Sequence, residues 1–247
     1  MPRIHLNALK SEYSISDFRD FSPSCPLYSI LYKLSNGERL EPVDVAWLTE
    51  NHLFHPNSKV SRAYHRLEAL FYEQEFQRTK SLWHLPSASS HWRRAGEPKR
   101  ALKLTNALFW EKVKDKKLLS ALLTTRGGAF RDIKELDETE KCARLAIKYQ
   151  PESHHPYTLM GAICYERGEY YEGDRWFAEA ISRGAIPGDQ EAEIKRLLRN
   201  SESQKKRRQV VEYLIQKDPK RYAWAKSYLK ASKASRFQSE SVQLYHA

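Results

Sequence analysis

The chain has 247 residues, of which 40% are apolar and 30% are charged, and its net charge is +11. Such a composition excludes a chain too polar to form a core. No apolar run approaches the roughly eighteen residues of a membrane span, and the opening MPRIHLNALK lacks the apolar stretch of a secretory signal. We therefore expect a cytoplasmic protein that does not associate with a membrane.

Glycine, proline and cysteine are all sparse, with 9, 11 and 3 residues. Few turn-forming residues favour long helices over a many-stranded sheet, so we predict an all-α fold. Three cysteines without a Cys-x-x-Cys pair argue against a disulfide framework and against a structural zinc site. We expect reduced cysteines, no metal and no cofactor.

The N-terminal part of the chain is predicted to contain an arm and a helical lobe. Residues 1–23 show no firm hydrophobic period and are expected to form an irregular arm, whereas residues 24–85 are expected to form the lobe. Its first helix should begin at Ser24, carry Pro26 in its first turn and end at Gly37. A hairpin turn at Asn36-Gly37 is the alternative, which the helical apolar spacing disfavours.

Two further helices are predicted in this lobe. The first covers Pro42 to Glu50, and the second covers Ser58 to Lys80. Apolar spacing predicts the inward residues of the two helices, which are Val43, Ala46 and Trp47 in the first and Val60, Ala63, Leu67, Leu70 and Phe71 in the second. The segment after Pro86 is expected to break the helical pattern.

Paired helices are predicted throughout residues 86–217. The expected helices after the turn at Gly96 cover residues 99–114, 118–132, 136–149, 155–167, 170–183, 191–199 and 205–216. Residues 218–247 are expected to form a capping helix to about Lys230 and a frayed basic tail.

A spacing of 34 residues recurs in the middle of the chain. It relates Gly127 to Gly161, Ala146 to Ala180, Leu123 to Tyr157 and Pro151 to Ala185. Small residues at these positions alternate with large ones such as Trp176 and Phe177, as expected where two helices interlock. Helix pairs with this period are typical of tetratricopeptide repeats, and residues 120–185 resemble two adjacent repeats of that family. Departures are Thr139 and Gly173, where the family favours alanine, and Ala143, where an aromatic residue is usual.

The resemblance implies a right-handed superhelix of stacked antiparallel helix pairs, closed by the C-terminal helix. Ligands of this family lie along the first helix of each pair. By this resemblance the partner groove is lined by Thr124, Arg131, Asp132, His155, Thr158, Tyr165 and Glu166. The lysine–asparagine clamp that related domains use for chaperone termini is absent, because Thr124, Gly128, Thr158 and Ala162 occupy its positions.

Clusters of cations suggest a second kind of contact. Residues 190–247 contain 14 Lys and Arg against 6 Asp and Glu, and Lys205, Lys206, Arg207 and Arg208 are adjacent. Together with Arg93 and Arg94, these cations could contact the phosphates of DNA or RNA. Further basic clusters lie at Lys99-Arg100 and over residues 112–117, and no recognised nucleic-acid motif accompanies them.

Motifs for catalysis are weak. TTRGGAF (Thr124 to Phe130) lacks the Gly-Lys-Ser/Thr ending of a phosphate-binding loop. His52 and His55 have no third metal ligand at a telling distance, and the cysteines have no histidine placed to activate them. Arg78 and His84 are spaced like the Arg–His pair of small helical ribonucleases, although Thr79 is not the polar residue those enzymes prefer.

These observations favour a scaffold without catalytic activity, which binds a protein partner through a helical-repeat groove, as a subunit of a larger assembly. The alternative is an accessory protein that holds nucleic acid on its basic surfaces beside a partner enzyme. A helical nuclease is the third hypothesis.

Overall fold

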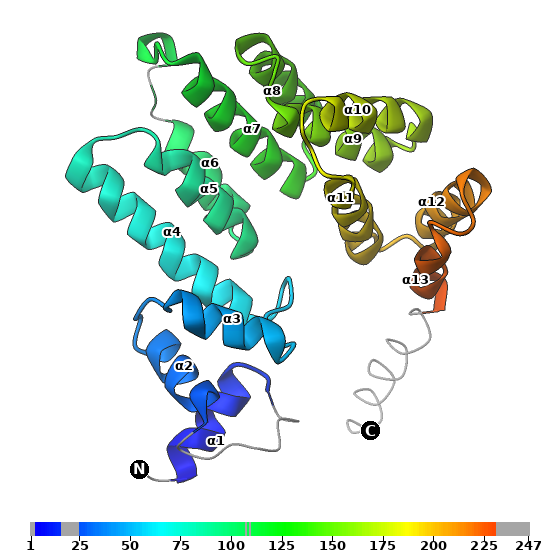
Figure 1. The fold of residues 1–247 in the computed structure, drawn as a ribbon. Coiled ribbons are helices and arrows are strands. Elements are labelled where there is room, and N and C mark those ends of the chain that lie inside the picture. The colour runs from blue at the N-terminus through cyan, green and yellow to red at the C-terminus, as the bar shows by residue number, and fades with distance from the viewer. Residues whose placement is uncertain (1–2, 16–24, 107, 109, 231–247) are drawn as a thin grey trace, which may run out of the picture. The chain divides into compact units, whose positions relative to one another are not determined.

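The structure is a computed structural model that describes residues 3–15, 25–106, 108 and 110–230. In this part of the chain it contains thirteen α-helices, two short 3-10 helices and no strand (Figure 1), which confirms the all-helical prediction there. The chain divides into two compact units, residues 1–142 and residues 143–247, and the boundary falls inside one helix. We call them unit 1 and unit 2.

Unit 1 contains seven helices and the first half of an eighth. They are α1 (Arg3–Glu12), α2 (Pro26–Ser35), α3 (Pro42–Glu50), α4 (Lys59–Thr79), α5 (His84–Arg94), α6 (Pro98–Asn106), the 3-10 helix η1 (Trp110–Lys112), α7 (Lys116–Asp132) and α8 (Leu136–Tyr149), which continues into unit 2. The unit boundary lies within the segment predicted to be a continuous array of repeats.

Unit 2 contains the remaining helices. They are α9 (His154–Arg167), α10 (Tyr170–Ser182), α11 (Pro187–Asn200), α12 (Gln204–Lys217), the 3-10 helix η2 (Ala223–Lys226) and α13 (Ser227–Lys230). Bounds were predicted closely for α3, α4, α8, α9, α10 and α12. The predicted single helix from Pro219 to Lys230 is wrong, because helical structure starts only at Ala223 and changes type at Ser227.

The N-terminal lobe of unit 1 is built around α2. Its apolar residues Leu27, Ile30, Leu31 and Leu34 are all buried, as the helical spacing predicts. Gly37 ends the segment with φ of +75°, a conformation that costs glycine little. The helix begins after Cys25, and Ser24 lies outside the described residues. The predicted irregular arm contains α1, whose C-terminal side packs Leu9 into the same core.

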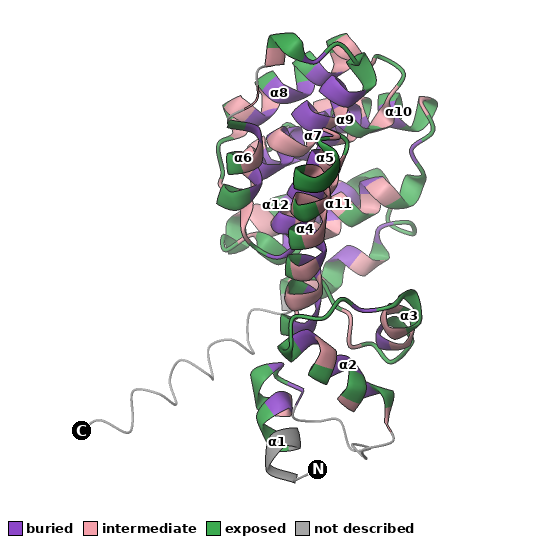
Figure 2. Ribbon diagram, turned by 90° about the vertical axis from the view of Figure 1, so that its left-hand side faces the viewer, coloured by how far each residue is buried: buried purple, intermediate pink, exposed green. Residues whose placement is uncertain are grey.

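The inner face of α3 differs from the prediction. Val43 is 71% exposed, and Ala46 is also exposed, whereas Leu48 is buried; most of α3 is accordingly coloured exposed or intermediate in Figure 2. Asp44 explains why a different face of α3 turns inward. Its carboxylate accepts a hydrogen bond from the backbone N–H of Glu41 and pairs with Lys33 of α2 at 2.7 Å. These contacts turn the face containing Leu48 toward α2.

The buried face of helix α4 includes polar residues that the prediction did not place there. Ser58 caps the helix through a hydrogen bond from the N–H of Ser61, as expected for a serine at this position. Val60 is buried as predicted, but Leu70 is 36% exposed, and the buried face includes His65 and Glu68. The assignment of Leu70 to the interior was wrong because partners from other elements satisfy these two polar groups.

The predicted break after Pro86 is also wrong, because α5 runs through this segment from His84 to Arg94. Proline is compatible with the first turn of a helix, where N–H groups lack intrahelical partners anyway. Helix α6 ends at Asn106, earlier than the predicted Lys114. Helices α5, α6 and α7 pack on one another in unit 1.

Glycines allow α9 and α10 of unit 2 to approach closely. A Cβ atom added to Gly161 would lie 2.8 Å from a ring carbon of Phe177, and one added to Gly173 would lie 2.5 Å from a ring carbon of Tyr165 and 3.1 Å from the carbonyl oxygen of Gly161. Both rings are 1% exposed. The interlock of large and small residues that the sequence predicts is therefore present between α9 and α10.

Asp174 of α10 connects four helices of unit 2. Its carboxylate accepts hydrogen bonds from the Tyr165 hydroxyl at 2.8 Å, the Gln190 amide at 3.2 Å and the Tyr213 hydroxyl, and it pairs with Lys217 at 2.5 Å. Burial and the adjacent carboxylate raise the pKa of both tyrosines, so the hydroxyls remain protonated donors. Ile194, Leu197 and Leu198 of α11 complete the core beside α12.

Candidate functional site

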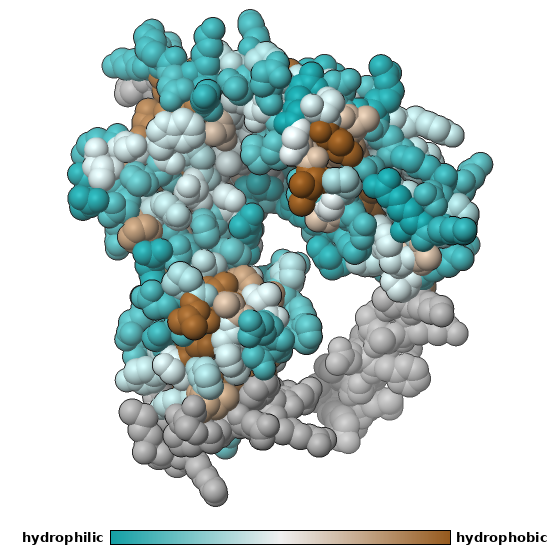
Figure 3. Space-filling model, viewed as in Figure 1, coloured by the Kyte–Doolittle hydropathy of each residue, from teal (hydrophilic) through white to brown (hydrophobic). Residues whose placement is uncertain are grey.

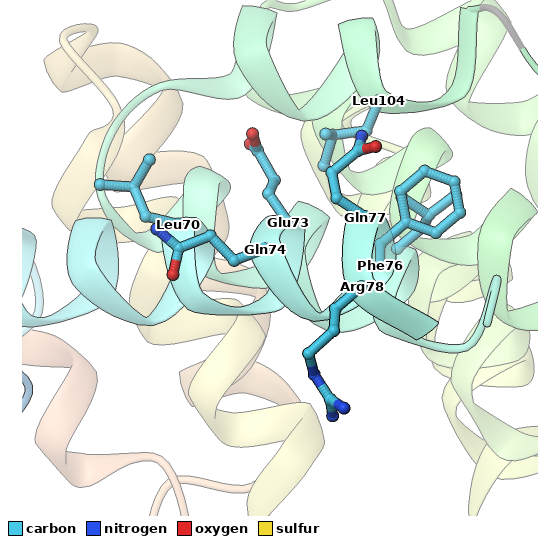
Figure 4. Close-up of a pocket in the computed structure, with 8 residues that line it drawn as sticks. Leu70, Glu73, Gln74, Phe76, Gln77, Arg78 and Leu104 are labelled. Carbon is cyan, nitrogen blue, oxygen red and sulfur yellow. The ribbon is translucent and has the colours of Figure 1, made fainter. Parts of the chain in front are cut away.

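A shallow pocket of about 670 Å³ lies between α4, α5 and α6 of unit 1 (Figure 4). It is lined by Leu70, Glu73, Gln74, Phe76, Gln77, Arg78, Leu85 and Leu104. Helix α4 provides six of the eight residues. Among them Leu70, Glu73 and Gln77 are three and four positions apart, which places them on successive turns of one helix face. None of the eight was predicted as a binding residue, and only Arg78 was a candidate, as a member of the Arg–His pair. The sequence carried no signal for this pocket, because apolar spacing assigns Leu70 to the interior.

The pocket combines an apolar floor with polar groups from α4. Leu85 of α5 is buried, and Leu104 of α6 is half-buried. Figure 4 shows the Glu73 carboxylate and the Gln77 amide on the side of α4 nearest to Leu104, whereas Arg78 points to the other side. An incoming segment would therefore meet both apolar contacts and hydrogen-bonding groups here.

Two contacts fix the ionisable residues of the pocket. The indole N–H of the buried Trp92 donates to the carboxylate of Glu73, which orients that side chain. The guanidinium of Arg78 forms two hydrogen bonds with Glu75, at 3.1 and 2.6 Å, so its charge is already paired. The pocket thus presents one oriented carboxylate, glutamine amides and apolar surface.

Polar contacts between α4 and α5 hold this wall of the pocket together. Nδ1 of His65 lies 3.0 Å from Nδ1 of His91, so one imidazole donates and the other accepts. Burial, with smaller contributions from His91 and Arg94, lowers the pKa of His65 to about 3, and burial also lowers the pKa of His91. Both rings are therefore neutral at physiological pH, and their hydrogen bond is a contact between neutral groups.

A bidentate ion pair lies next to the histidine pair. Arg39 donates to both carboxylate oxygens of Glu68, at 2.7 and 2.8 Å, and its guanidinium lies 3.6 Å from the ring centroid of Phe71. Glu68 is 5% exposed, so the pair compensates a buried charge on α4. These contacts, together with the histidine pair, explain why α4 turns Leu70 outward.

The three predicted groove residues of unit 1 lie on α7. Arg131 is 3% exposed, which leaves it almost no surface for a partner. Asp132 pairs with Arg93 at 2.8 Å, and the hydroxyl of the half-buried Thr124 donates to the carbonyl of Ser120. Each of the three side chains is thus engaged within the fold, and Thr124 and Asp132 retain partial exposure.

The four predicted groove residues of unit 2 lie on α9. His155 is exposed, and Thr158 is half-buried with its hydroxyl donating to the carbonyl of His154. Tyr165 is 1% exposed and donates to Asp174, and Glu166 is buried as well. Of the predicted groove residues in this unit, His155 and Thr158 are therefore the two that a partner could contact.

The predicted nucleic-acid contacts divide into two classes. Arg93 lies over Gly128 and pairs with Asp132, Lys206 donates to the carbonyl of Glu166, and Arg207 donates to the carbonyl of Ser201 at 2.7 Å. The remaining three, Arg94, Lys205 and Arg208, are exposed. Half of the predicted cations thus serve internal contacts.

The remaining candidates from the sequence are the Arg78–His84 pair, the cysteines and a metal site. His84, the first residue of α5, has its ring centroid 6.2 Å from that of Tyr72, whereas Arg78 pairs with Glu75. The three cysteines are free, and burial raises the pKa of Cys142 and of Cys164 to about 11. Among the described residues, no three His, Cys, Asp or Glu side chains are grouped to hold a metal ion, and no helix combines the length and apolarity of a membrane span.

Comparison of the chain with protein-family models, with curated proteins and with solved structures finds no match.

Proposed function

We propose that the chain is a non-catalytic helical-repeat scaffold that binds a segment of a partner protein, as a subunit of a larger assembly. The α9–α10 pair carries the proposal, because its two helices interlock through Gly161 and Gly173 in the segment with the 34-residue period. A repeat of this kind buries its apolar face against the adjacent repeats, and an array of such repeats offers an extended binding surface. We extend the same tetratricopeptide-like description to residues 120–185 as a whole.

We place one docking site for the partner in the pocket between α4, α5 and α6. Peptide-binding sites commonly join apolar surface to a few groups that fix the orientation of the ligand. Leu70, Leu85 and Leu104 would supply the apolar surface, and Gln74 and Gln77 would supply amides for the backbone of the bound segment. The exposed His155 on α9 belongs to the second docking surface that we propose.

Site-specific photocrosslinking in native extract tests the proposal. A photoreactive residue replaces Gln74 in one variant of the full chain and His155 in another. Control variants carry it at Glu50 and Glu202, which are exposed residues, one in each unit, outside both docking surfaces. We expect a discrete crosslinked protein at Gln74 or His155 that survives nuclease treatment and is absent from both controls.

The proposal is wrong if neither surface yields a crosslinked protein above the level of the controls. It is also wrong if the purified chain alone turns over a substrate of the partner, because a scaffold contributes binding without chemistry.

A further inference from the structure

We propose that the pocket between α4, α5 and α6 recognises a lysine or arginine side chain of the bound partner segment, and that the carboxylate of Glu73 determines this specificity. The inference rests on the scaffold function proposed above and adds the chemistry of the partner to it. The segment has a basic residue beside an apolar one, so that one side chain reaches Glu73 and the other packs on the leucines of the pocket.

The Glu73 carboxylate is oriented without being neutralised. It accepts a hydrogen bond from the indole N–H of the buried Trp92. Because an indole carries no charge, this contact fixes the direction of the carboxylate and leaves its negative charge in place. Among the described residues, Glu73 forms no ion pair and no other hydrogen bond. One of its two oxygens is therefore free to accept a hydrogen bond from a ligand.

The cations at the pocket are engaged by other groups. The guanidinium of Arg78 forms its two hydrogen bonds with Glu75, and it points away from Glu73 in Figure 4. The ammonium of Lys80 donates to the side-chain oxygen of Gln77 at 3.4 Å, about two turns of helix beyond Glu73. Glu73 is therefore the acidic group of the pocket whose charge no neighbouring cation compensates.

The cation next to Trp92 is engaged as well. The guanidinium of Arg100 lies 3.6 Å from the ring centroid of Trp92 and 3.5 Å from the carboxylate of Glu97. Glu73 itself is half-buried, and a carboxylate that is partly withdrawn from water is stabilised by a cation that reaches it. The pocket therefore favours a basic ligand, although the net charge of the whole chain is +11.

Apolar groups on both sides of the carboxylate suit the stem of a basic side chain. Figure 4 shows the Glu73 carboxylate between Leu70 on one side and Leu104 and Gln77 on the other. The surface along α4 combines hydrophilic side chains with small hydrophobic areas (Figure 3). Lysine and arginine pack their aliphatic stems on such groups while the charged end reaches an anion. An acidic segment or a phosphate group would be repelled by Glu73.

Peptides with one variable residue test the inference by fluorescence polarisation with the full chain. The four probes have the sequence Ser-Ala-Leu-X-Leu-Ala-Ser, where X is lysine, arginine, glutamine or glutamate. An uncharged label at the N-terminus and an amide at the C-terminus leave X as their only ionisable group. The test variant is Glu73→Gln, which removes the charge and keeps a side-chain oxygen for Trp92. The control is Glu50→Gln, which makes the same charge change on an exposed residue of unit 1 outside the pocket.

We expect the parent and the control variant to bind the lysine and arginine probes about tenfold more tightly than the glutamine probe, because hydrogen bonds between ionised groups are stronger than neutral ones. The glutamate probe should bind most weakly. In Glu73→Gln this preference should disappear, while the affinity for the glutamine probe stays unchanged. High salt should reduce the preference of the parent. Circular dichroism checks that both variants keep the helical content of the parent.

The inference is overturned if the parent binds none of the probes, if it binds the lysine, arginine and glutamine probes equally, or if Glu73→Gln keeps the preference of the parent. The scaffold proposal is judged separately by the crosslink from Gln74. An equal yield of that crosslink with and without Glu73→Gln rejects the specificity for a basic residue and leaves the scaffold proposal standing.

Discussion

A methyl group at Gly173 would collide with a ring that has no free space beside it. The Cβ atom would lie 2.5 Å from Tyr165, which is 1% exposed and whose hydroxyl is held by Asp174. We expect Gly173→Ala to lower the free energy of unfolding by about 1–3 kcal/mol, because overpacking exceeds the roughly 1 kcal/mol that alanine gains in a helix. Urea denaturation followed by circular dichroism measures the change.

Gly188→Ala is the matched control for this substitution. Gly188 lies in the first turn of α11, and the nearest atom to its added Cβ would be 3.8 Å away, an ordinary contact distance. We expect this variant to be neutral or slightly more stable than the parent. Equal stability of the two alanine variants would contradict a close approach of α9 and α10 at Gly173.

Sequence reasoning succeeded for Gly161 and Gly173 because their partners lie within one helical hairpin. The spacing of small and large residues within that hairpin reveals the contact. Gly128 was not explained in this way, because its space is filled by the guanidinium of Arg93, which lies on a different helix pair. A contact between two such distant residues leaves no periodic signal in a single sequence.

At the scale of the element, the α4–α5 interface should make stability depend on pH. Histidine has a reference pKa of 6.5, and that of buried His65 is lowered to about 3. Between these values the unfolded chain binds more protons than the folded chain, so the free energy of unfolding falls as pH decreases from 6.5 toward 3. We expect a double variant, His65→Phe with His91→Phe, to show a smaller decline over this range in chemical denaturation.

His55→Gln is the control for the histidine pair, since His55 is exposed and outside the interface. This variant should retain the decline of the parent protein. If the parent and the double variant lose stability equally between these pH values, the histidine pair does not titrate as described.

The same interface explains why the inner face of α4 was only partly predicted. Its length follows from local residues and was expected. The burial of His65 and Glu68 depends on His91 and Arg39, which come from α5 and from the segment before α3. Because hydrophobic periodicity counts such positions as polar surface, it assigned Leu70 to the interior and did not identify the pocket beside it.

At the scale of the whole molecule, the two compact units should respond separately to a local defect. Asp174→Ala removes the acceptor for the buried Tyr165 and for Tyr213 and the partner of Lys217. We expect a loss of about 2–4 kcal/mol, from unsatisfied donors that are costly when buried. Hydrogen exchange followed by mass spectrometry should become faster in α9–α12 and stay unchanged in α4–α6.

Glu172→Ala is the control for this experiment, because the ion pair of the half-buried Glu172 with the exposed Arg175 lies near the surface and such pairs contribute little. Faster exchange in both units of the Asp174 variant would show that the chain unfolds as one cooperative body.

The order of helices along the chain was predicted well, since caps, glycines and apolar spacing are local properties. The division into units depends on which helices contact one another, and such contacts are not local properties. Among the predicted site residues, exposure separates His155 and Lys205 from Tyr165 and Arg131. Composition and spacing alone do not show which polar side chains are engaged by contacts within the fold.

The guanidinium of Arg93 occupies the volume that a side chain at position 128 would need, with its Nη1 only 2.1 Å from where a Cβ atom would lie. The two positions are therefore coupled sterically. Because the guanidinium is the far end of a flexible side chain, a larger residue at 128 would displace it and break its ion pair with Asp132, and the cost of the substitution is the loss of that ion pair.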